Sequence, residues 1–125
     1  MTGQRLSAAY CPDGAIALHE LEVEPDAGYS VRCRARLALR GRTEYREASA
    51  HGAISAMSEI LYGLNAGVEI VSLHHQHDGA GTAAYLLCER DGRQCWAYGR
   101  GTDGDEATIA ALVAGANQLA TPILD

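Results

Sequence analysis

The sequence lacks the features that mark a membrane or a secreted protein. No apolar run approaches the ~20 residues that a transmembrane helix needs. Residues 1–14 contain one arginine and no apolar segment of the kind found in secretory signals. We therefore expect no membrane association and a cytoplasmic location.

Paired cysteines and known cofactor motifs are also missing. None of the four cysteines is in C-x-x-C spacing, which excludes the usual zinc and redox signatures. Cys33, Cys88 and Cys95 alternate in phase with small or apolar neighbours, which is typical of buried free thiols. Cys11 is expected to be exposed and not activated. Without a nucleophile motif or a cofactor fingerprint, we expect no cofactor.

The chain has no lysine, and its net charge of −6 argues against general nucleic-acid binding, which requires a basic face. Arg32, Arg34 and Arg36 form one local exception, continued by Arg40, Arg42 and Arg46. Acids before residue 50 can neutralise this group. We interpret it as the solvated face of a sheet.

With 125 residues, the chain is expected to form one domain, residues 1–125, with its own core. Residues 16–23, 30–40 and 43–50 have the pattern of strands, with tight turns at Pro25–Gly28 and Gly41–Arg42. From Gly52 the apolar spacing changes to three and four residues, which predicts an amphipathic helix ending near Asn65.

The same order of elements then returns. Residues 68–77, 82–90 and 93–100 are expected to be strands, with a hairpin turn at Asp91–Gly92. Asp103 and Glu106 resemble a capping box, which predicts a second helix ending near Asn117–Gln118.

The two halves, about 16–66 and 67–120, align with each other. Gly41 matches Gly92, and Tyr45 matches Trp96. This internal repeat predicts an α+β fold of two strand-strand-strand-helix units, with antiparallel sheets and helices on one face. Each half alone is too small for a good core, so the halves should pack around a pseudo-two-fold axis.

Four segments carry a resemblance to a known family: "HGAISAMSEIL", "GVEIVSLHHQHDGAGTAAYLLCE", "RDGRQCWAYGRGTD" and "ALVAGANQL". Over about residues 16–119, the chain resembles the C-terminal regulatory domain of 2-isopropylmalate synthase. In that family the domain follows a metal-dependent barrel, binds leucine and joins two chains. The resemblance implies a homodimer that binds a small molecule, regulates a partner enzyme in trans and carries no catalytic metal.

The resemblance also implies where the ligand binds. The corresponding positions are His51, Gly52, Val71, His74, Asp78, Ala80, Thr82 and Arg100. His74 stands where the family commonly has tyrosine, and Asp78 and Arg100 stand where it has small or apolar residues. Because buried charges without partners are costly, we do not expect leucine as the ligand. We expect another amino acid or a related small carboxylate.

Three of the five histidines fall within residues 74–77. Strand alternation puts His75 and His77 on one face and His74 on the other. A metal site would need His75, His77 and Asp78, together with a further ligand from His19 or His51. We expect no metal site. The structural interpretation has His75 and His77 hydrogen-bonded to backbone at a strand end.

An enzyme is the alternative function. His74 would act as acid and base, oriented by Asp78, with Arg100 holding a carboxylate, in a cofactor-independent cyclisation, isomerisation or dehydration. A purely structural dimerisation domain is a third interpretation. Trp96 and Tyr98, in phase with Arg100, either pack on the core or a helix or form an aromatic wall for a ligand.

Overall fold

The computed structural model describes residues 4–6 and 16–120 and confirms the α+β fold. The elements are β1 (Gln4–Leu6), β2 (Ile16–Pro25), β3 (Val31–Leu39), β4 (Arg42–Ala50), α1 (Ala53–Gly63), β5 (Glu69–Asp78), β6 (Gly81–Arg90), β7 (Arg93–Gly101) and α2 (Gly104–Ala120). Strand β1 was not expected from the sequence, which suggested no element before residue 16.

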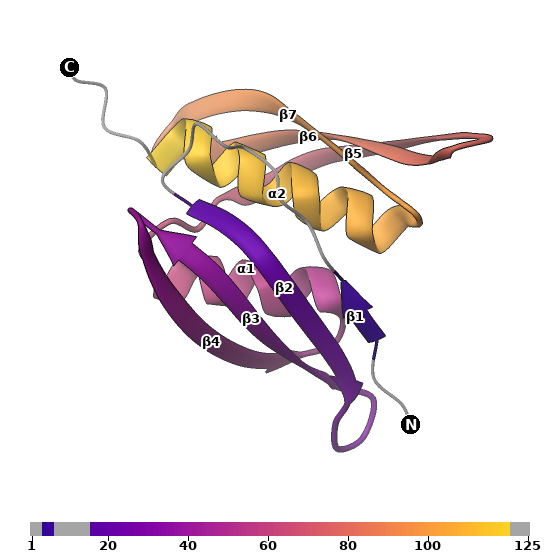
Figure 1. Ribbon diagram of the computed structural model, residues 1–125. Helices are drawn as coiled ribbons and strands as arrows, with labels where there is room; N and C mark the ends of the chain where they lie inside the picture. The colour runs from indigo at the N-terminus through magenta and orange to yellow at the C-terminus, as the bar shows by residue number, and fades with distance from the viewer. Residues whose placement is uncertain (1–3, 7–15, 121–125) are drawn as a thin grey trace.

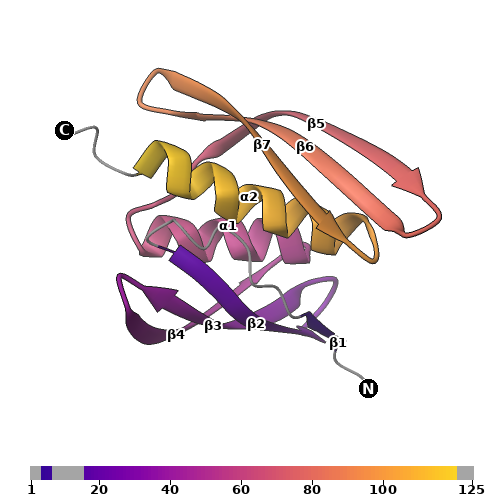
Figure 2. The ribbon, with the colours of Figure 1, turned by 45° about the horizontal axis from the view of Figure 1, so that its top comes forward.

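The molecule has two antiparallel sheets with both helices between them (Figures 1 and 2). The first sheet has the order β1-β2-β3-β4, and the second has the order β5-β6-β7. Helix α1 packs on β3 and β4, whereas α2 packs on β6 and β7 and also reaches β2. The inward faces of the sheets and the two helices therefore build one continuous core.

The internal repeat is visible in the backbone. Asp91 and Gly92 both have positive φ, and so do Arg40 and Gly41, which is the pattern of a type I′ hairpin turn in each half. The first turn thus lies one residue earlier than the expected Gly41–Arg42. Each half also has a register irregularity at the same place in its first strand, between Leu18 and Glu20 and between Ile70 and Ser72.

Helix α2 extends to Ala120, past the expected end at Asn117–Gln118. Residues 107–117 of this helix are all buried, because the helix lies between both sheets rather than on one of them. Asn117 is buried within the helix, and its side chain bonds the backbone of Ile16, so this asparagine is not a helix end. Neither helix in the described part of the chain has the length and apolarity needed to cross a bilayer.

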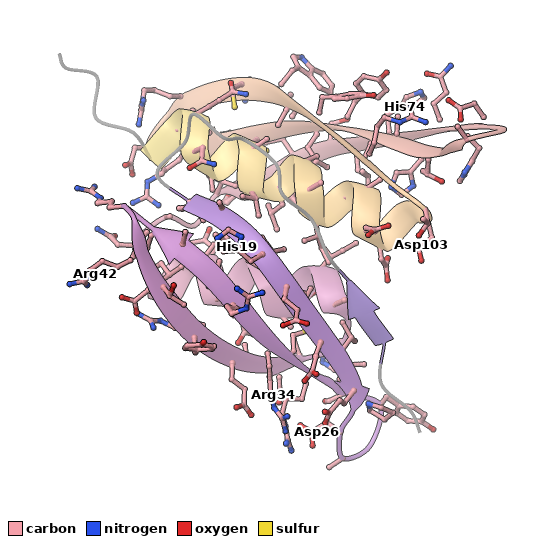
Figure 3. All side chains as sticks on the ribbon, viewed as in Figure 1. His19, Asp26, Arg34, Arg42, His74 and Asp103 are labelled. Atoms are coloured by element: carbon pink, nitrogen blue, oxygen red, sulfur yellow. The ribbon has the colours of Figure 1, made fainter. Side chains whose placement is uncertain are left out.

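The arginines of β3 face away from the helices and are paired with acids. Arg34 lies within 4.0 Å of Glu22, Glu24 and Glu47. Figure 3 shows Arg34 and Asp26 on the side of the first sheet that points away from both helices. Arg32 and Arg36 have acidic partners of their own on the same face. The interpretation of these arginines as a neutralised, solvated sheet face agrees with this arrangement.

The cysteines that the structure describes are free thiols, as expected. Burial raises the pKa of Cys33 to about 11 and that of Cys88 to about 12. Cys95 is half-buried, and desolvation raises its pKa as well. Cys11 lies outside the described residues.

Candidate functional site

Strand β5 is exposed on both faces, although its equivalent in the first half is covered. Leu18 and Leu21 of β2 are 2% and 0% exposed, whereas the matching Ile70 and Leu73 of β5 are 37% and 44% exposed. Helix α2 lies against β2, and β1 pairs with its edge, but neither helix makes a comparable contact with β5. Ile70 and Leu73, the apolar residues on the inner face of β5, are therefore only partly covered in a single copy of the chain.

A shallow groove runs between this strand and the exposed side of α1. Ile54, Ser58 and Tyr62 line it from the helix, and Val68 and Ile70 line it from the chain entering β5. The remaining lining residues are Ser55 and Glu69. The groove combines apolar side chains with hydroxyl groups and one carboxylate, a mixture suited to a small amphipathic ligand.

Three of the residues implied by the resemblance lie close to this groove in sequence. His51 and Gly52 directly precede α1, where Gly52 is the N-cap residue and its carbonyl accepts a hydrogen bond from the Ala56 amide. Val71 is the bulged residue of β5 and is exposed.

Another implied residue, His74, lies on the outer face of the second sheet, beside aromatic residues that do not belong to the implied set. His74, Tyr85 and Tyr98 are direct neighbours across β5, β6 and β7. The ring centroids of Tyr85 and Tyr98 are 5.2 Å apart, and those of His74 and Tyr85 are 6.3 Å apart. Trp96 lies two residues from Tyr98 on the same strand and face. Figure 3 shows His74 on the side of this sheet that points away from α2.

Asp78 and Arg100 form an ion pair on the same outer face. One guanidinium nitrogen, Nη2, donates to both carboxylate oxygens at 3.2 Å. On β6, the register partner of Asp78 is Gly81 and that of Arg100 is Ala83, and both partners are small. The Ala80 amide donates to Asp78, and this bond, followed by the bond from Arg100, holds the pKa of the carboxyl below its usual value. Hydrogen bonding to Tyr98 and then to Asp78 raises the pKa of Arg100.

His74 and Asp78 are not brought together. Both lie on the outer face of β5, but they are four positions apart along the extended strand. At 3.3 Å per residue, this spacing puts their backbones roughly 13 Å apart. Asp78 is instead bonded to Ala80 and Arg100. The orienting contact that the enzyme alternative requires is therefore absent between these two residues, and that alternative stays a prediction.

His75 and His77 face inward, opposite to His74, as the alternation predicted. The Nε2 atom of His75 lies 2.7 Å from the hydroxyl of buried Thr108, and the Nδ1 atom of His77 lies 2.9 Å from the hydroxyl of Thr82. Their partners are thus threonine side chains rather than the expected backbone groups. Within the described ranges, no three His, Cys, Asp or Glu side chains gather as a metal site.

Seven of the eight implied residues therefore fall into two regions. His51, Gly52 and Val71 are near the groove, whereas His74, Asp78 and Arg100 lie on the outer face with Ala80 at the adjoining turn. Thr82 belongs to neither region, because it is buried on the inner face against His77.

The groove itself was not anticipated from the sequence. The sequence predicted an amphipathic helix from Gly52, but not that Ile54 is only half-buried, and the exposure of Ile70 and Leu73 depends on where α2 packs. The sequence signal that could have indicated the groove is Tyr62, an aromatic residue on the otherwise polar side of α1.

Comparison with models of known protein families finds no match to this chain, and comparison with curated proteins finds none either.

Proposed function

We propose that this chain is a dimer-forming domain that binds an amino acid or a related small carboxylate, similar to the regulatory domain of 2-isopropylmalate synthase. A second copy would cover the inner face of β5. The ligand would occupy the groove between α1 and β5, and its binding would be communicated to a partner enzyme in trans.

The observation that carries this proposal is the contrast between the two halves. Ile70 and Leu73 occupy the positions of Leu18 and Leu21, which are fully buried. Large apolar side chains that are exposed together on one strand indicate a surface that another molecule covers. A second copy of the same chain is the occupant favoured by an exposed strand edge, because two copies of β5 can pair their edges about a two-fold axis.

Within this ligand class, the chemistry of the groove supports an amino acid best. Ile54, Val68 and Ile70 offer apolar contacts for a side chain, and Glu69 offers a carboxylate for an ammonium group. An open groove encloses too little of a small ligand for tight binding, since such ligands bury most of their surface in concave sites. Coverage by the second copy would provide the enclosure, so ligand binding and dimerisation should be coupled.

Sedimentation equilibrium tests the dimer. The wild-type chain should sediment as a dimer, and Leu73→Glu should sediment as a folded monomer because the new charge would be buried at the interface. Tyr29→Glu is the matched control, since Tyr29 is an exposed aromatic residue in the β2–β3 turn and should leave the dimer intact. A monomeric wild-type chain at high micromolar concentration would overturn the proposal.

Thermal unfolding tests the ligand. The proteinogenic amino acids and small 2-oxo and 2-hydroxy carboxylates would be added singly, and at least one should raise the melting temperature by mass action. Ser58→Trp fills the groove and should abolish the rise, whereas Glu59→Trp, on the neighbouring residue outside the groove, should retain it. A rise that persists in Ser58→Trp would locate the ligand elsewhere.

A further inference from the structure

The outer face of the second sheet carries an aromatic platform, defined as His74, Tyr85, Trp96 and Tyr98. Trp96 is 59% exposed and Tyr98 is 49% exposed. The inward residues of the same strands, such as Leu86 and Ala97, already fill the core against α2. Of the two interpretations of Trp96 and Tyr98, packing on the core or on a helix is therefore wrong.

The fold does not require aromatic side chains at these positions. In the first half, the equivalent positions across the three strands hold ion-paired charged side chains. Glu22 corresponds to His74, Arg34 to Tyr85, and Glu47 to Tyr98. Both sets of side chains face away from the helices. Since one repeat tolerates charges where the other has rings, the rings are not explained by folding.

The charged side chains beside the platform do not favour an anionic ligand. Asp78 and Arg100 border it and neutralise each other, and the chain as a whole carries a net charge of −6. A polyanion such as a nucleic acid needs basic contacts along its backbone, which this surface lacks. A polyanionic ligand is therefore disfavoured.

The platform is also open and small. From Trp96 to Tyr98 it extends roughly 7 Å along the strands and about 10 Å across three of them, on the order of 70 Å² of surface. A stable protein interface needs about 800 Å² on each partner, which disfavours a folded protein. A flat surface also cannot enclose a compact small molecule. An extended chain of small units fits this shape better.

The rings do not share a plane. The ring planes of Tyr85 and Tyr98 are inclined to each other by 53°, and those of His74 and Tyr85 by 41°. One rigid planar molecule cannot stack on all of them at once. A chain of rings joined by rotatable bonds can adjust each unit to a separate aromatic face.

A neutral oligosaccharide combines these properties. The C–H face of a sugar ring packs on an aromatic ring, while its hydroxyl groups exchange hydrogen bonds with polar side chains at the edges. Gln76, Asp78 and Arg100 provide such groups along one margin of the platform. We propose that the aromatic platform is a binding site for a neutral oligosaccharide, separate from the groove between α1 and β5.

Trp96 makes this proposal directly measurable, because it is the one tryptophan of the chain. Its fluorescence would be followed while maltohexaose, cellohexaose, xylohexaose, mannohexaose or chitohexaose is added. At least one of these should give a saturable change that is insensitive to salt and strengthens with the length of the oligosaccharide. Tyr98→Ala should weaken binding by about tenfold or more, the scale of one lost stacking contact.

Two control variants distinguish binding at the platform from binding elsewhere on the surface. Tyr45→Ala removes the exposed aromatic residue that matches Trp96 in the first half and should bind like the wild type. Calorimetry on Trp96→Ala, which lacks the fluorophore, should show the same loss as Tyr98→Ala. The proposal is overturned if none of the oligosaccharides binds, or if binding survives in Tyr98→Ala. It is also overturned if heparin, a polyanion, is the only saccharide that changes the fluorescence. A change of the fluorescence on dilution of the protein without any saccharide would overturn it as well, because it would mean that a second copy of the chain covers the platform.

Discussion

The side chain of Asn117 bonds both backbone groups of Ile16, a residue 101 positions away in the sequence. The Ile16 amide donates to Asn117 Oδ1 at 2.8 Å, and Asn117 Nδ2 donates to the Ile16 carbonyl at 2.8 Å. Both hydrogen bonds are buried and join the last helix of the second half to the first strand of the first half. This contact holds α2 against β2, and it is one reason why β2 is covered while β5 is not.

Replacing Asn117 should destabilise the whole domain. In Asn117→Ala both backbone groups of Ile16 lose their buried partner, which we expect to lower the free energy of unfolding by about 3 kcal/mol. Chemical denaturation measures this change. Gln118→Ala is the control, because Gln118 is exposed on the same helix and should change stability little. Equal effects of the two substitutions would mean that the Asn117 contact is not stabilising.

The close approach of β7 to α2 predicts a second large effect. A side-chain atom added at Gly99 would collide with the backbone of Ala107 and Ala111, which belongs to a rigid buried helix. Gly99→Ala should therefore destabilise the protein by about 1–3 kcal/mol or prevent folding. Gly63→Ala meets no atom within 4 Å and should be neutral or slightly stabilising. Thermal unfolding of both variants measures the contrast.

The ion pair between Asp78 and Arg100 predicts a pH dependence in acid. The folded-state pKa of Asp78 lies below its ordinary value of 3.8, so the ionised carboxylate is stabilised by folding. Its contribution is complete above pH 3.8 and is lost as the pH falls through the lower folded-state value. Asp78→Asn should therefore lower the melting temperature slightly at pH 7 and leave it unchanged near pH 2. A difference that is larger at pH 2 would contradict this sign.

The buried thiols should resist modification. Because burial raises the pKa of Cys33 to about 11 and that of Cys88 to about 12, almost no thiolate is present at pH 8. Iodoacetamide at pH 8, followed by peptide mass spectrometry, should leave both residues unmodified in the folded protein. Both should react in denaturant. Rapid alkylation of Cys88 without denaturant would show that the second sheet opens readily.

Local patterns predicted the fold well, and long-range packing explains what they missed. The alternation of residues 30–40 and the Asp91–Gly92 turn depend only on nearby residues, so strands, turns and the repeat could be inferred. The burial of α2 on all sides and the contact between Asn117 and Ile16 join distant segments, and no local periodicity reports them.

The candidate site was predicted only in part for the same reason. Alternation correctly separated His74 from His75 and His77. On an extended strand, His74 and Asp78 also share a face, but their spacing of four residues keeps them apart. The exposure of Leu73 could not be inferred, because Leu21 has the same position in its repeat and is buried.

Isotope-filtered NMR on mixed labelled and unlabelled chains decides whether a second copy covers the inner face of β5, on which the proposed dimer depends. The methyl groups of Ile70 and Leu73 should show nuclear Overhauser effects to the other chain, and Leu18 and Leu21 should show them only within their own chain. The proposed dimer is contradicted if the methyl groups of Ile70 and Leu73 show nuclear Overhauser effects only within their own chain. It is also contradicted if the effects between chains are confined to Trp96 and Tyr98.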